Sequence, residues 1–294
     1  MKRKYLWMLV AILVYSLSMR AQDDAVFKLV KEDGHFYFRT SVNGVKATMM
    51  FESGVPGLLM GDAFYEAHKE SLKMDVKPCD EKIRYLGGLH NVKLSANWAR
   101  IRIGRAIFEG PVKIVEDDAS LKFPIQMLHH ATDSSNIVWM DLKKNEFRII
   151  SRTRLQSLVK KAKMMELGFN KWDMPTVRTT LTIKADGRQT SIEGVFIADM
   201  GNASLLFINK SQPNVVKMLE DGRIDLKEAR TKDGKISTEA FYADRLTICD
   251  RKFKGVTVGV NPFKSLDEYG FLGVKFFDIP TIFDFSDKKL YLCK

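Results

Sequence analysis

The chain has 294 residues, of which 45% are hydrophobic and 28% charged. This balance excludes a disordered or low-complexity protein. The formal net charge is +11, but the basic residues are spread along the chain and are densest only at Lys160, Lys161 and Lys163. This distribution argues against a dedicated nucleic-acid surface.

The N-terminus has the pattern of a secretory signal peptide. Residues 2–4 are all basic, and Tyr5 to Leu17 form an uncharged, mostly apolar run that is short for a membrane span. Small residues then lead to a cleavage point after Ala21. We therefore expect residues 1–21 to be removed and the protein to be exported, to the periplasm or the extracellular space, with no further membrane contact. An uncleaved anchor is the alternative.

The rest of the chain is predicted to be mostly β. Short runs rich in Val, Ile, Thr and Phe are separated by dipeptides that favour tight hairpins. The predicted strands include His35 to Val42, Val45 to Phe51, Val177 to Ile183, Val195 to Ala198 and Leu246 to Cys249. The hairpin dipeptides are Asn43-Gly44, Asp186-Gly187 and Asp233-Gly234.

Helical periodicity is limited to three stretches. Asp62 to Lys73 is predicted to be a helix with Asp62 as its N-cap, and Pro213 to Glu220 has a similar pattern. The longest predicted helix, Arg154 to Leu167, falls near the middle of the chain. It is expected to join two halves.

Those halves contain a weak internal repeat. Asp141 to Ile149 aligns without gaps on Asp284 to Leu292, 143 positions later, as an acid, an apolar residue, a polar turn and an apolar strand. Upstream, residues 51–54 match residues 198–201 at an offset of 147. The repeat predicts an N-terminal β lobe at 22–152, a helix-containing linker at 153–176 and a C-terminal β lobe at 177–294.

Related lobes commonly pack about a pseudo-twofold axis, and such packing would place Glu52 opposite Asp199. Two facing carboxyl groups share one proton, because both cannot easily ionise together. The ionised member then takes a proton from a water, and the protonated member donates to a carbonyl oxygen. Gly54 and Gly201, two residues after each acid, allow the tight turns that this arrangement needs.

An acid-x-Gly sequence after an apolar strand, once per lobe, resembles the Asp-Thr/Ser-Gly signature of pepsin-like and retropepsin-like aspartic proteases. Gly270 to Gly273 is similar to the apolar-apolar-Gly element of that family, and Ile282 to Leu292 looks like the ending of bacterial aspartyl proteases. The resemblance covers Phe36 to Leu292. It implies a two-lobed, aspartic-protease-like β-barrel fold, a peptide or protein substrate, and no cofactor or metal.

The resemblance also places a flap, a hairpin over the cleft, at residues 85–89, and its second-lobe counterpart at residues 232–235. Tyr85 would be the aromatic residue of the flap. The substrate-binding residues that the resemblance implies are Tyr85, Gly87, Gly88, Ser53, Gly54, Gly201 and Asn202.

The sequence departs from the family pattern at several positions. Glu52 stands where the family has Asp, and Met200 replaces the Thr or Ser whose hydroxyl would tie the two loops together. Val55 and Asn202 follow the two glycines, where the family prefers Ser or Thr. Ile125 to His129 lies where an apolar-Gly element is expected, without the glycines. The first lobe is therefore the less preserved one.

Two functional hypotheses follow. The first is an exported aspartic endopeptidase-like hydrolase in which Glu52 and Asp199 activate water. The second is a catalytically inactive pseudo-protease that holds a peptide or protein segment in the cleft. A structural β protein without a cleft function is a third, weaker option.

Other candidate features have simpler interpretations. His129-His130 near Asp133 is expected to be a surface loop, and no metal-ligand spacing is present. The residues expected in the core are Trp139, Trp172, Phe276 and Phe277. Cys249 and Cys293 are either bridged or buried thiols, with Cys79 free in the first case.

Overall fold

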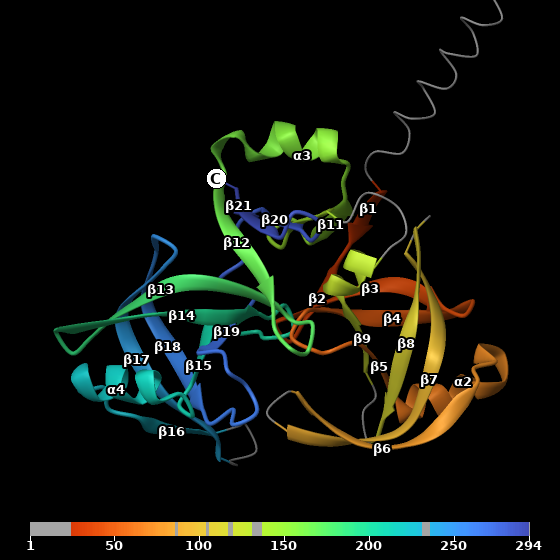
Figure 1. Ribbon diagram of the computed structural model, residues 1–294, viewed down its shortest axis with the longest axis horizontal. Helices are drawn as coiled ribbons and strands as arrows, with labels where there is room; N and C mark the ends of the chain where they lie inside the picture. The colour runs from red at the N-terminus through yellow and green to blue at the C-terminus, as the bar shows by residue number, and fades with distance from the viewer. Residues whose placement is uncertain are drawn as a thin grey trace, which may run out of the picture.

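A computed structural model describes residues 25–85, 88–103, 106–116, 120–130, 137–230 and 236–293. Two β-rich lobes lie side by side below a shared sheet that carries helix α3 on its outer side (Figure 1). Within the described residues, no helix is both long and apolar enough to span a bilayer. The predicted signal peptide lies outside the described residues, so its cleavage stays a prediction.

The first lobe is built from one sheet of order β2-β3-β4-β9-β5-β8-β7-β6, with an additional pairing of β3 and β7. Its elements are β2 (Val30–Glu32), β3 (His35–Val42), β4 (Val45–Glu52), β5 (Leu58–Gly61), α2 (Asp62–Leu72), β6 (Val76–Tyr85), β7 (Gly88–Ile103), β8 (Ala106–Val115), β9 (Leu121–Pro124) and the 3-10 helix η1 (Ile125–His130).

The second lobe repeats this order as β12-β13-β14-β19-β15-β18-β17-β16, with the equivalent additional pairing of β13 and β17. Its elements are β12 (Lys163–Phe169), β13 (Pro175–Ala185), β14 (Arg188–Ala198), β15 (Leu206–Asn209), α4 (Pro213–Asp221), β16 (Lys227–Arg230), β17 (Ile236–Ile248), β18 (Arg251–Asn261) and β19 (Gly270–Leu272). The internal repeat predicted from the sequence is therefore confirmed strand by strand.

A symmetric sheet joins the lobes, in the order β1-β11-β10-β20-β21-β12. Its remaining strands are β1 (Ala25–Lys28), β10 (Ile137–Asp141), β11 (Glu146–Ile149), β20 (Thr281–Asp284) and β21 (Lys289–Leu292). Val138 pairs with Phe283, and Met140 pairs with Thr281. Thr281 lies 143 residues after Val138, and Phe283 lies 143 residues after Met140, so the repeat offset converts each pair into the other. A twofold axis between β10 and β20 requires this relation.

The hairpin dipeptides form tight turns. Asn43 and Gly44 have φ values of 49° and 87°, and Asp186 and Gly187 have 49° and 75°. Two consecutive positive φ angles match the twist of adjacent antiparallel strands, and Asn-Gly and Asp-Gly tolerate them best. Asp233-Gly234 lies outside the described residues.

The structure corrects the longest predicted helix. α3 covers only Arg152–Leu158, a 3-10 turn (η2) covers Val159–Lys161, and the chain then enters strand β12. In β12, Met165 and Leu167 are buried while Met164 and Glu166 are exposed, an alternation of period two. The edge of β21 offers backbone partners to this segment, and that tertiary pairing overrides the local helical pattern.

The structure also corrects the predicted N-cap of α2 and decides between the two alternatives for the cysteines. The N-cap of α2 is Gly61, which has no side chain to donate or accept, and Asp62 lies in the first turn of the helix. All three cysteines are free thiols. Cys249 is buried beside the Thr179 hydroxyl, with 3.0 Å between sulfur and oxygen.

Candidate active site

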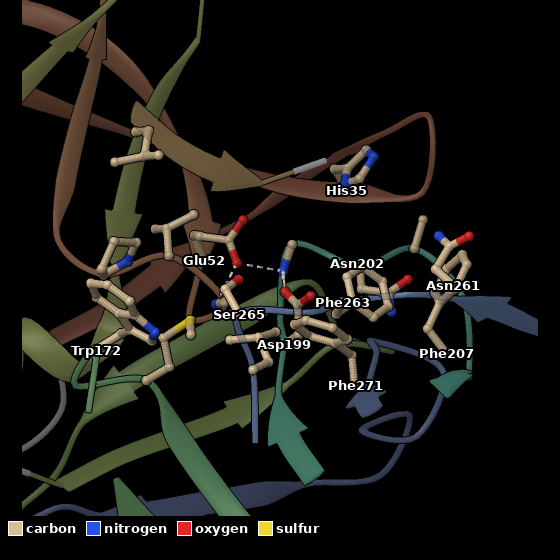
Figure 2. Close-up of a pocket in the computed structure, with 18 of the residues that line it drawn as sticks. His35, Glu52, Trp172, Asp199, Asn202, Phe207, Asn261, Phe263, Ser265 and Phe271 are labelled. Atoms are coloured by element: carbon tan, nitrogen blue, oxygen red, sulfur yellow. Dashed lines mark hydrogen bonds between the residues drawn. The ribbon is translucent and has the colours of Figure 1, made fainter. Parts of the chain in front are cut away.

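The two acidic turns begin where equivalent strands end. Glu52 is the last residue of β4, which lies parallel to β9, and Asp199 directly follows β14, which lies parallel to β19. The backbone N–H of Asp199 also donates to the carbonyl of Leu272 at 2.8 Å. These parallel pairings hold both turns at the boundary between the lobes, where the side chains of Glu52 and Asp199 approach each other (Figure 2).

The close approach of the carboxylates depends on two glycines. A Cβ atom on Gly201 would lie 1.7 Å from Oε2 of Glu52, and one on Gly54 would lie 2.4 Å from Oδ1 of Asp199. Each turn thus leaves room for the carboxylate of the opposite lobe. Any side chain at either glycine would push the pair apart.

Backbone donors converge on Glu52. Its Oε1 accepts from the N–H groups of Ser53 at 2.7 Å, Gly54 at 2.8 Å and Gly201 at 2.9 Å. The last of these crosses from the second lobe (Figure 2). The extra methylene of Glu52 is accommodated because the carboxylate lies over the glycine of the opposite turn.

Asp199 is partly exposed to the cleft and accepts from the N–H of Gly201 at 3.0 Å. Burial, the nearby charge of Glu52 and a side-chain hydrogen bond with Glu52 raise the pKa of Asp199 well above the ordinary aspartate range. The backbone N–H groups of Gly201 and Asn202 oppose this rise only in part. Asp199 is therefore the member of the pair suited to carry the shared proton.

A hydroxyl ties the two turns together from one side. Ser53 Oγ donates to the carbonyl of Ala198 at 2.6 Å and accepts from the N–H of Met200 at 2.8 Å. Met200, at the equivalent place in the second lobe, is fully buried and lacks a hydroxyl. Of the two hydroxyl contacts that would link the turns symmetrically, only the one from Ser53 of the first lobe is therefore present.

Gln126 supports the first-lobe turn, a role that the sequence analysis missed. It is buried, and its Nε2 donates to the carbonyl of Val55 at 2.8 Å and to that of Ser53 at 3.3 Å. The strand equivalent to Gly270–Leu272 is Leu121–Pro124, because each lies parallel to the strand that leads into an acid. The expected placement, which began at Ile125, was therefore four residues too late, because the strand begins at Leu121.

A cavity of about 550 Å³ lies over the carboxylate pair. Its lining residues include both acids, Gly54, Gly201, Asn202, Val55, Pro56, Lys82, Ile83, His35, Trp172, Met174, Ala203, Phe207, Phe263 and Phe271. Trp172 was predicted to be a core residue, but its side chain is 46% exposed at this cavity. The prediction held for Phe276 and Phe277, which are fully buried.

The other predicted site residues have different outcomes. Asn202 reaches the cavity, but its Oδ1 accepts from the N–H and the hydroxyl of Ser204 and not from the acid. Gly87 lies outside the described residues. Tyr85 and Gly88 are paired at the end of the β6–β7 hairpin, and Lys82 and Ile83 of β6 line the cavity.

Two segments of the sequence analysis cannot be placed in the structure. Asp133 and all of residues 232–235 lie outside the described residues. Within the part of the chain that the structure describes, no group of three His, Cys, Asp or Glu side chains is placed to hold a metal ion.

No family model matches the sequence, and no curated protein matches it. The crystal structure of aspartic proteinase from Irpex lacteus does match the fold, with a TM-score of 0.56 over 92% of this chain and 97% of that chain. The two sequences are 9% identical over this alignment. The chain therefore has a mostly β, aspartic-proteinase-like fold, and the similarity extends over both lobes.

Proposed function

We propose that this protein is an exported, aspartic-type endopeptidase in which Glu52 and Asp199 act as one acid–base unit on a peptide bond. The observation that carries the proposal is the juxtaposition of the two carboxylates at the floor of a cavity, with Gly201 N–H donating to both. Fold alone would not suffice, since one fold hosts many functions.

The chemistry requires one proton on the pair. Asp199, whose pKa is raised, is suited to hold that proton. The three backbone N–H groups that donate to Oε1 of Glu52 suit a carboxylate in the role of base. Glu52 takes a proton from a water as the water oxygen bonds to the carbonyl carbon, and Asp199 gives its proton to the carbonyl oxygen. When the C–N bond breaks, Glu52 returns its proton to the leaving nitrogen, and Asp199 regains one from the tetrahedral intermediate.

The alternative is a pseudo-protease that binds a peptide in the same cavity without cutting it. Two observations favour it. Glu52 carries one methylene more than the aspartate of the resembling family, and displacements near 1 Å cost on the order of a hundredfold in rate. Met200 also leaves the cross-lobe hydroxyl contact one-sided.

Cleavage of a mixed peptide library over a range of pH separates these functions. We expect the wild type to release new peptide ends, and Glu52→Gln and Asp199→Asn each to lower the rate by about a hundredfold or more. Glu109→Gln and Asp250→Asn, which change exposed carboxylates in surface ion pairs, are matched controls and should leave the rate unchanged.

Each outcome of this assay has a defined meaning. Cleavage that survives either change in the pair would exclude the proposed acid–base unit. Peptide binding by the wild type without cleavage would favour the pseudo-protease. Export is tested separately, by sequencing the N-terminus of the mature protein, which should begin at Gln22.

A further inference from the structure

The two rims of the cavity are equivalent in position but not in chemistry. Tyr37 pairs with Met50 and Thr176 with Ile197, and each partner lies two positions before an acid. His35 is therefore the first-lobe counterpart of Met174. Figure 2 shows His35 on one side of the carboxylate pair and Trp172, two residues before Met174, on the other.

Trp172 is held rigidly at its rim. Oδ1 of Asn170 accepts from the N–H groups of Trp172 at 2.9 Å and Met174 at 3.0 Å, and the N–H of Asn170 donates to the carbonyl of Met174 at 3.0 Å. Lys171 in the same loop pairs with Asp267, with 3.3 Å between nitrogen and oxygen. These hydrogen bonds pre-order the loop, which lowers the conformational entropy that a ligand contacting it has to remove.

The indole has a cation beside it, with Lys171 Nζ 5.9 Å from the ring centroid, but it still remains accessible. Nearly half of its surface is exposed, and the cavity that it lines also has the apolar lining residues Val55, Ile83 and Met174. An exposed tryptophan on a rigid loop at a cavity offers a large flat apolar surface, and such residues are enriched among binding hot spots.

The opposite rim offers polar groups. The Nδ1 atom of His35 is buried and has no hydrogen-bond partner in the described part of the chain. Asn202, on the same side in Figure 2, has its Oδ1 engaged by Ser204 and presents its NH2 group as a donor. The two halves of a pseudo-symmetric cleft thus differ in what they recognise.

We propose that Trp172 is a specificity-determining residue that stacks against a large apolar or aromatic side chain of a bound peptide. The opposite rim has no tryptophan, because the strict counterpart of Trp172 is Asp33 and His35 is that of Met174. The contact therefore also fixes the direction in which the peptide lies across Glu52 and Asp199. The occupant, a peptide, rests on the proposed function, but the contact itself does not require cleavage.

Binding is therefore measured in the non-cleaving Asp199→Asn background. The probes are two capped octapeptides that differ only in a central Phe or Ala, titrated by calorimetry. We expect the Phe peptide to bind at least tenfold more tightly than the Ala peptide. Trp172→Ala should remove that difference, and Trp172→Phe should retain most of it. Trp98→Ala is the matched control, because Trp98 is 45% exposed, also faces a cation and lies outside the cavity.

Direction is tested with the Phe peptide carrying a photo-crosslinking group at its N-terminus. In the wild type, Trp172 should hold the peptide in one direction, so the group should label one lobe. His35→Trp adds an indole to the opposite rim and should allow both directions, so both lobes should be labelled. Equal binding of the two peptides, failure of both to bind, or an unchanged preference in Trp172→Ala would overturn the proposal. If cleavage depends on the acid pair while Trp172→Ala changes nothing, the peptidase assignment stands and only this inference fails.

Discussion

At the scale of single residues, two glycines decide whether the acids can meet. Gly201 and Gly54 each occupy the space where a Cβ would overlap the carboxylate of the other lobe. Gly57, three residues further along the first turn, has no atom within 4 Å of its Cβ position. The requirement for glycine is thus local to the contact between the turns.

Gly201→Ala should separate the carboxylates and lower peptide cleavage by about a hundredfold, since small displacements of reacting groups are that costly. Gly57→Ala is its control and should change the free energy of unfolding by no more than about 0.5 kcal/mol, with activity retained. Full activity in Gly201→Ala would show that the pair does not depend on this contact.

The raised pKa of Asp199 also predicts a pH-dependent stability. A carboxyl whose pKa is raised on folding favours the native state below its unfolded pKa, and this contribution is lost as the pH rises through the folded pKa. We therefore expect Asp199→Asn to gain stability over the wild type as the pH increases from about 4 to about 8. Thermal unfolding measures the difference, and a gap that narrows with rising pH would be the opposite of this expectation.

At the scale of elements, local sequence rules predicted hairpins better than helices. Asn43-Gly44 and Asp186-Gly187 specify their turns through backbone conformation alone, and both turns were predicted. Residues 163–167 follow a helical pattern as well as a strand pattern, and only the free edge of β21 decides between them. That edge is distant in sequence, so the error was unavoidable from local pattern.

Gln126 shows that local sequence pattern is equally limited in predicting the site. A buried glutamine after β9 has no recognisable motif, and its role emerges only when η1 is placed under the Glu52 turn. Trp172 was misjudged for a related reason, because aromatic residues are usually buried and a rigid exposed loop has no simple sequence signal. The acids themselves were found because they occur twice.

Gln126→Leu should destabilise the protein by about 1 to 3 kcal/mol, because it leaves the buried carbonyls of Ser53 and Val55 without their donor. Gln156→Leu, on the exposed face of α3, is the control and should have little effect. Urea unfolding measures both. A neutral Gln126→Leu with unchanged activity would mean that the turn holds its shape unaided.

At the scale of the whole molecule, the symmetric sheet makes the lobes one unit. Phe147 on β11 packs at a tilt against Phe51 of the first lobe, with 4.8 Å between ring centroids, and the ring centroid of Phe283 on β20 lies 5.8 Å from that of Phe277. The acids face each other only if this sheet fixes both lobes, so the geometry of the site is a property of the assembled chain.

We accordingly expect a single thermal unfolding transition. Phe147→Ala, which opens a cavity at a fully buried position, should cost about 3 to 5 kcal/mol. It should lower the stability of both lobes together in hydrogen exchange. Two separate calorimetric transitions, with only the first lobe affected, would show that the lobes unfold independently.

The shared proton is the central claim, and the titration of the Asp199 carboxyl carbon followed by NMR tests it most directly. The wild type should titrate well above the ordinary aspartate range, and Glu52→Gln should lower the midpoint because the neighbouring charge is gone. An Asp199 that titrates near about 4, with no response to Glu52→Gln, would contradict the account.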